Sequence, residues 1–157
     1  MKVCCLVDSS EISLNAFKYY LEKIHKPENQ VHVFHAILQP NLPSIADVFD
    51  VMGVSLHVSK ITEVLTDFNK KEDELRVKIE NMFNCNCDAK ETYHKHDNKV
   101  DTASFIGPAA VEYATTNKIE MIVCGSRGLT GIKKHWLGSV SDYCLRNATC
   151  SVVISRS

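Results

Sequence analysis

A glycine-rich loop between an apolar segment and a helix is the clearest candidate for chemistry in this sequence. Gly125 follows the apolar run 119–124, Gly128 comes three residues later, and Gly138-Ser139 stands where a helix is expected to begin. Glycine permits positive φ and lets an anion approach backbone N–H groups without a Cβ in the way. Unpaired amides and the positive dipole end of the following helix also favour phosphate. The spacing predicts a phosphate-binding loop, and the alternative is a set of turn glycines with Ser139 as a simple N-cap.

A carboxylate, Asp8, directly follows the first apolar run, residues 3–7. At the carboxyl end of a central strand, such a group can accept hydrogen bonds from a sugar hydroxyl or an amino group. The alternative is an ordinary helix N-cap or loop acid. The sequence contains no G-x-x-x-x-G-K-[ST] motif, and no G-x-G-x-x-G follows the first run, so neither a P-loop nor the usual dinucleotide fold is supported.

Three further groups of residues could do chemistry, and each has a simpler alternative. Lys133, Lys134 and His135 could neutralise outer phosphates or lie solvated in a loop. Trp136 fits a packing or dimer contact better than a stacking platform for nucleic acid. Soft metal ligands occur close together, but their C-x-C and H-x-H spacing lacks the zinc-finger pattern and favours packing and a solvated loop. These ligands are Cys85, Cys87, His94 and His96.

Short apolar or alternating segments, separated by helical patterns, must position these residues. Strands are expected at 3–7, 30–38, 87–94, 119–124 and 150–154. Helices are expected after Ser9 or Ser10, over 59–83, from Gly107-Pro108 to about Lys118, and over 139–147, with an irregular loop from 39 to about 57. This alternation predicts an α/β fold, a doubly wound parallel sheet of five strands. Its ligand site would lie beyond the carboxyl ends of the strands, at Asp8, Ala36 and Gly125.

Composition narrows the class of protein. The 157 residues fit a single domain over 1–157, and 18 basic against 19 acidic side chains leave a formal charge of −1. No global field then favours nucleic acid or an anionic membrane. The apolar runs are too short to cross a bilayer, and Asp8 interrupts any signal peptide. Seven cysteines without a CxxC pair indicate reduced thiols, so we expect a cytoplasmic protein.

The loop motif resembles that of the universal stress protein family. ATP-binding members carry G-x-x-G, nine residues, then G-[S/T], and Gly125, Gly128, Gly138 and Ser139 match this pattern. The resemblance extends over essentially the whole chain, including Leu6-Val7-Asp8 and the closing helix and strand. It implies a 3-2-1-4-5 strand order, helices on both faces, a bound ATP or AMP, and a homodimer joined through the C-terminal strand.

The resemblance also implies roles for individual residues. Asp8 and the backbone around Leu6 and Val7 would meet adenine and ribose, and Ala36 would contact adenine. The residues implied along the ribose and phosphates are Gly125, Arg127, Gly128, Gly138, Ser139, Val140 and Ser141. The stretch 95–106 departs from the family, because it is longer and more polar than the usual link into the next helix.

We therefore expect a nucleotide-binding stress-response protein that acts as a dimeric sensor or modulator. The alternatives are a slow ATP hydrolase and a nucleotide-free interaction protein of the same fold. No catalytic residue is assigned, since no acid near the loop is placed as a general base and the ligands for a Mg²⁺ ion accompanying the nucleotide are not evident. Neither a nucleic acid nor a membrane is expected as a partner, and no resident metal site is expected.

Overall fold

Helices and strands alternate along the chain in the computed structural model, which describes residues 1–38, 54–86, 98–100, 103–126 and 137–156. In chain order the elements are β1 (Lys2–Leu6), α1 (Glu11–Tyr19), the π-helix η1 (Tyr20–Ile24), β2 (Gln30–Phe34), β3 (Ala36–Leu38), α3 (Val54–Asn86), β4 (Asn98–Val100), the 3₁₀ helix η2 (Ala103–Phe105), α4 (Ile106–Thr116), β5 (Met121–Gly125), α5 (Ser139–Asn147) and β6 (Ser151–Ser155). The predicted α/β class is confirmed.

The strands in the described part of the chain are all parallel, and there they form two ladders rather than one five-stranded sheet. The larger sheet has the order β2-β1-β5-β6, and β3 pairs separately with β4. The predicted second strand is interrupted at His35, so β2 pairs with β1 and β3 pairs with the outer strand. If β2 and β3 are counted as one broken strand, the order is the expected 3-2-1-4-5.

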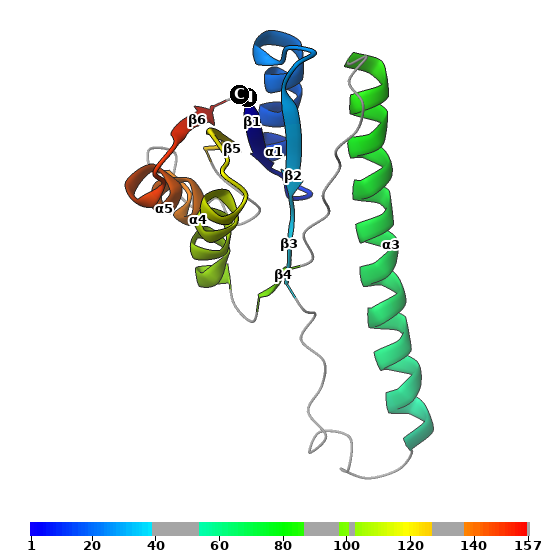
Figure 1. Ribbon diagram of the computed structural model, residues 1–157. Helices are drawn as coiled ribbons and strands as arrows, with labels where there is room; N and C mark the ends of the chain where they lie inside the picture. Colours follow the sequence, from blue (N-terminus) through cyan, green and yellow to red (C-terminus); the bar gives the residue numbers. More distant parts are fainter. Residues whose placement is uncertain (39–53, 87–97, 101–102, 127–136, 157) are drawn as a thin grey trace.

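Alternating residues of β1 face two separate cores. Val3 and Cys5, with Val7 just after the strand, join a cluster built with α1, η1 and α3, whereas Cys4 and Leu6 join one built with α4 and α5. Figure 1 shows these helices on the two sides of the sheet. A strand buried on both faces is apolar throughout, which explains why residues 3–7 form a continuous apolar run.

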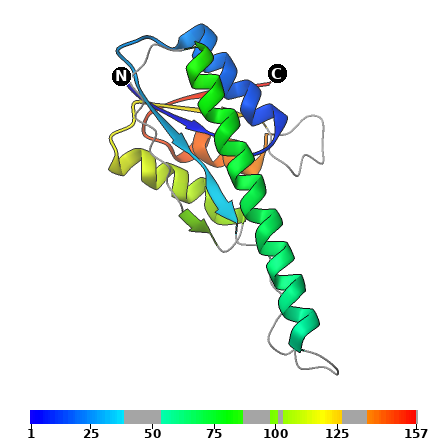
Figure 2. The ribbon, with the colours of Figure 1, turned by 90° about the vertical axis from the view of Figure 1, so that its right-hand side faces the viewer.

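The helix α3 is longer than predicted. It begins at Val54 instead of 59, ends at Asn86 instead of 83, and continues through the charge run 70–74 without a break. Its C-terminal half packs on the sheet through Leu75, Ile79 and Phe83. Its N-terminal end extends well past the strands (Figure 2).

The outer strand lies later in the chain than expected. The predicted strand 87–94 is outside the described residues, and the strand that pairs with β3 is β4, within the stretch 95–106 predicted to be a polar link. The sequence did not predict β4, because it is a three-residue edge strand with Val100 as its one apolar residue, and such strands give almost no hydrophobic pattern.

One helix start also differs from expectation. The helix predicted to open at Gly107-Pro108 begins at Ile106, so Pro108 is its third residue instead of its first. Proline is tolerated there because the first amides of a helix have no intrahelical acceptor. The helix predicted over 139–147 is confirmed as α5.

None of the described helices is long and apolar enough to cross a membrane.

Candidate functional site

The carboxyl ends of β1 and β5 meet at one edge of the sheet, because the two strands are parallel neighbours. The helix α1 begins three residues after Asp8, and α5 is tied back to the same edge by a hydrogen bond from the Gly138 amide to the Ser126 carbonyl, at 2.7 Å. Two helix N-termini therefore lie beside the ends of two central strands. This is where ligands bind in open parallel sheets.

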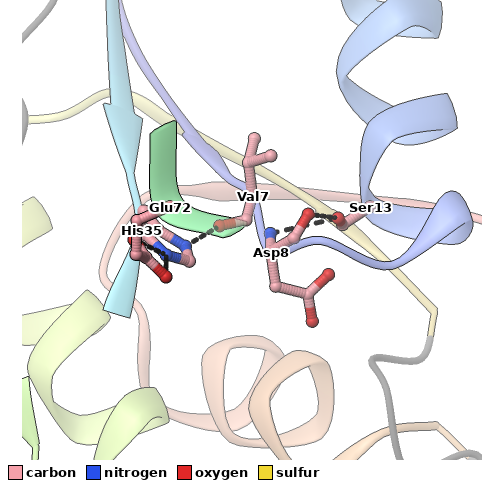
Figure 3. A network of polar contacts seen from close by, with 5 residues as sticks. All are labelled: Val7, Asp8, Ser13, His35 and Glu72. Atoms are coloured by element: carbon pink, nitrogen blue, oxygen red, sulfur yellow. Dashed lines mark hydrogen bonds and ion pairs between the residues drawn. The ribbon is translucent and has the colours of Figure 1, made fainter. Parts of the chain in front are cut away.

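The N-terminus of α1 is closed by its own side chains. Ser10 is the N-cap, and its hydroxyl accepts from the Ser13 amide at 3.3 Å. The Asp8 carboxylate in turn accepts from the Ser10 amide at 2.9 Å and from the Ser10 hydroxyl. Ser13 Oγ lies 2.7 Å from the Asp8 carbonyl and 3.1 Å from the Asp8 amide, so both backbone groups of Asp8 are held (Figure 3).

The N-terminus of α5 is open by comparison. Its N-cap is Gly138, which has no side chain to accept a hydrogen bond, and the first intrahelical bond joins the Asp142 amide to the Gly138 carbonyl at 2.9 Å. The amides of Ser139, Val140 and Ser141 precede that bond and have no acceptor within the helix. Three N–H groups at the positive end of a helix dipole suit one anionic group.

Ser141 supports this helix start from inside. Its side chain is buried, and its hydroxyl donates to the Gly138 carbonyl at 2.9 Å, with the Ser126 carbonyl at 3.3 Å. Ser126 itself continues the β5–β6 pairing, because its amide donates to the Ser155 carbonyl at 2.7 Å. The hydroxyl of Ser141 has one proton, so this side chain orders the loop end while its backbone amide stays at the N-terminal end of α5.

Gly125 allows β5 and α1 to approach closely. A Cβ at this position would lie 2.9 Å from Ile12 Cγ2, closer than real Cβ contacts, and 3.1 Å from the Ile12 carbonyl oxygen, which is tighter than most. Gly125 is thus required for packing at the strand end. The contact also brings the start of α1 against the strand that leads into the loop.

A second polar cluster lies on the other side of β1. His35, the residue between β2 and β3, places Nδ1 2.8 Å from the Val7 carbonyl oxygen and Nε2 3.0 Å from Glu72 Oε2. In Figure 3 these side chains lie between β1 and α3, on the opposite side of Val7 from Ser13. The cluster connects α3 to the strand end that carries Asp8.

Comparison with known proteins agrees with this architecture. The model of the universal stress protein family matches residues 1–156. The chain belongs to the universal stress protein family. A universal stress protein of Methanocaldococcus jannaschii is 25% identical over 156 residues, which cover 98% of this chain and 80% of that protein.

Solved structures of universal stress proteins share the fold. The protein UspA from Lactobacillus plantarum superposes with a TM-score of 0.66 at 15% identity, covering 99% of this chain and 97% of its own. A family protein from Arabidopsis thaliana with AMP bound has a TM-score of 0.61 at 16% identity, covering 100% and 93%. Two other structures of universal stress proteins are complexes with cAMP and, for Archaeoglobus fulgidus, dAMP.

The structure places most of the residues carried over from other universal stress proteins near one edge. Leu6 and Val7 are buried, so their backbone is what a ligand could reach, and Asp8 is half-buried at the strand end. Ala36 opens β3, and Gly125 closes β5. The N-terminus of α5 contributes Gly138, Ser139, Val140 and Ser141.

Several predicted residues fall outside the described part of the chain. Arg127 and Gly128 are among them, as are Lys133, Lys134, His135 and Trp136. The proposal that Ser139 serves only as an N-cap is wrong, because Gly138 occupies the cap and Ser139 is the first helical residue.

The described thiols are unsuited to nucleophilic chemistry. Cys4, Cys5, Cys124, Cys144 and Cys150 are all free. Burial, with a smaller contribution from the Cys144 thiol, raises the pKa of Cys124 to about 12, so this side chain at the end of β5 stays protonated at neutral pH. Within the described ranges, no three His, Cys, Asp or Glu side chains form a metal-binding group, while Cys87, His94 and His96 lie outside those ranges.

Sequence reasoning missed His35 and Glu72. A signal was available for Glu72, because it lies in phase with the apolar stripe formed by Phe68, Leu75 and Ile79, where a carboxylate indicates a polar partner. No comparable signal marks His35, since an alternating strand accommodates a histidine on either face.

Proposed function

We propose that this single-domain chain binds an adenine nucleotide, ATP or AMP, at the shared edge of β1, β5 and α5. In the proposed site, Asp8 and the ends of β1 and β3 receive the nucleoside, and the amides of Ser139, Val140 and Ser141 receive phosphate. Arg127 and Gly128 remain predicted contacts along the phosphates, and Mg²⁺ would enter only with the nucleotide.

One observation carries this proposal. Of the two helix N-termini at the site, α1 is capped by Ser10 and Asp8, whereas α5 begins at a glycine with no capping side chain. A helix that leaves three amides without an internal acceptor gains stability from an external anion. The AMP, cAMP and dAMP complexes of other family members support the choice of an adenine nucleotide.

We further propose that the protein works as a nucleotide sensor or modulator in a stress response, as a homodimer joined through β6. That strand ends the four-stranded sheet, and it carries Val152, Val153 and Ile154, none of which is fully buried. An apolar sheet edge favours pairing with a second copy across a two-fold axis. The five cysteines whose side chains the structure describes are free thiols, which fits a reducing compartment, and we propose the cytoplasm.

A capping side chain at position 138 should change nucleotide affinity without lowering the stability of the fold. In Gly138→Asp, the new carboxylate would accept from the α5 amides and repel phosphate, so stability should stay level or rise while nucleotide affinity falls at least about tenfold. Gly138→Ala also replaces the glycine but brings no hydrogen-bond acceptor, so its nucleotide affinity should stay within about threefold of wild type. Calorimetric titration with AMP and with ATP, with and without Mg²⁺, gives the affinities.

The proposal fails if the wild-type protein binds neither nucleotide, or if Gly138→Asp binds as tightly as Gly138→Ala.

The proposed dimer is tested separately by light scattering. Val153→Lys should shift a dimer toward monomer, whereas Val77→Lys, at an exposed position of α3, should not. A wild type that is monomeric at high micromolar concentration would contradict the dimer.

A further inference from the structure

The β1–β2 ladder ends in an unusual way. Its last backbone bond joins the Val7 amide to the Phe34 carbonyl at 3.0 Å. In a parallel pair the next bond would run from the Ala36 amide to the Val7 carbonyl. That carbonyl instead has His35 Nδ1 at 2.8 Å, and Ala36 starts the ladder with β4. An imidazole therefore replaces a backbone donor at the point where the strands separate.

The second nitrogen of the same ring is held by α3. His35 Nε2 lies 3.0 Å from Glu72 Oε2 and 3.2 Å from Glu72 Oε1. The side chains of His35 and Glu72 are 13% and 22% exposed. The Val7 carbonyl can only accept, so Nδ1 donates to it. With Nδ1 on Val7 and Nε2 on Glu72, both ring nitrogens are held by a partner, and the orientation of the ring is fixed.

We propose that His35 and Glu72 are positioning residues that set the separation of β1 and β3 where the nucleobase enters, and so contribute to base selectivity. This inference rests on the proposed function. His35 touches Val7 directly and precedes Ala36, and these two residues are the ones expected nearest the base. Glu72 acts through His35, because it fixes the ring that holds the Val7 carbonyl.

The position of Glu72 allows a substitution that separates its contact with His35 from the packing of α3. Glu72 lies in the apolar stripe of α3, in phase with Phe68 and Leu75. Glu72→Leu continues that stripe, so the helix should stay packed while His35 loses its partner. Glu72→Gln keeps a polar group opposite Nε2 and serves as the matched control.

Two substitutions of His35 separate its two contacts. Asparagine places an amide donor where Nδ1 lies and can hold the Val7 carbonyl without reaching Glu72. Glutamine places its amide nearer the position of Nε2 and favours Glu72 over Val7. Ile79→Val lowers the packing of α3 without touching the pair, and it controls for stability alone.

The experiment is calorimetric titration of the full chain with AMP and with GMP, alongside urea denaturation of each variant. Glu72→Leu and His35→Gln should bind AMP about tenfold more weakly and lower the AMP-to-GMP affinity ratio, with Glu72→Leu destabilised no more than Ile79→Val. His35→Asn, Glu72→Gln and Ile79→Val should retain AMP affinity within about threefold.

Each contrary outcome has a distinct meaning. Unchanged affinity and unchanged AMP-to-GMP ratio in Glu72→Leu would overturn the positioning role while leaving the nucleotide site intact. Should the His35 variants not fold, the Glu72→Leu and Glu72→Gln pair still decides the matter. A wild type that binds neither nucleotide would overturn the proposed function, and the positioning role with it.

Discussion

The two halves of α3 carry the same sequence pattern in different surroundings. Toward the C-terminus, Leu75, Ile79 and Phe83 are at most 8% exposed and pack on the sheet. Toward the N-terminus, the stripe continues through Val64 and Leu65, which are 39% and 38% exposed. Figure 2 shows why, because the N-terminal half extends past the last strands.

The difference teaches that an apolar stripe predicts a helix but not what the helix covers. Glu72 lies at the boundary between the two halves, with its carboxylate on His35. On one side of it the stripe has a sheet opposite, and burial stabilises the fold. On the other side, the apolar side chains of the stripe remain partly in water, so they contribute little to the stability of the single chain.

The largest expected contrast comes from truncating one apolar residue in each half. Ile79→Ala should lower the free energy of unfolding by about 2–5 kcal/mol, since it leaves a cavity in a fully packed cluster. Leu65→Ala should change it by less than about 0.5 kcal/mol, because the site is partly solvated. Urea denaturation followed by circular dichroism measures both. Equal losses would show that the exposed half is covered in solution.

Hydrogen exchange should show the same boundary along the backbone. Amides of residues 75–86 are held by tertiary packing, whereas those of 54–68 depend mainly on the helix itself, and isolated helical segments are only marginally stable. We expect protection factors at least about tenfold lower in the N-terminal segment. Peptide-resolved exchange at neutral pH gives the profile. Uniform protection along α3 would contradict the comparison.

The smallest expected effect concerns an ion pair in the exposed half. Lys71 Nζ lies 2.7 Å from Asp67 Oδ2, one helical turn away, and the hydrogen bond to that carboxylate raises the pKa of Lys71. Both side chains are well solvated, so Asp67→Asn should leave the urea midpoint unchanged within error. Glu80→Gln, which removes a similar pair with Arg76, is the matched substitution. A clear shift in either midpoint would mean that these pairs belong to a less solvated surface.

Much of the fold was predictable because burial leaves a strong pattern. The runs 3–7 and 119–124 are apolar throughout since both faces of their strands are covered, and the 139–147 helix is flanked by a glycine and a strand. The short edge strand β4 was not predictable, because three residues with one apolar side chain produce no period.

The candidate site divides in the same way. Glycine and serine spacing identified the start of α5, since an anion-binding helix end needs those residue types next to one another in the chain. The His35–Glu72 pair joins residues 37 positions apart, and only the packing of α3 against the sheet brings them together. Contacts of that kind depend on tertiary structure and leave no local spacing to read.

The uncapped start of α5 has a thermodynamic consequence. A glycine N-cap forgoes about 0.3 kcal/mol of helix stability that a capping side chain would supply. An anion bound at Ser139, Val140 and Ser141 would act as a removable cap, so occupancy and folding become linked equilibria. The melting temperature of the chain would then rise with ligand concentration. The segment whose local opening changes most would be α5 together with β6, the strand that follows it in the chain.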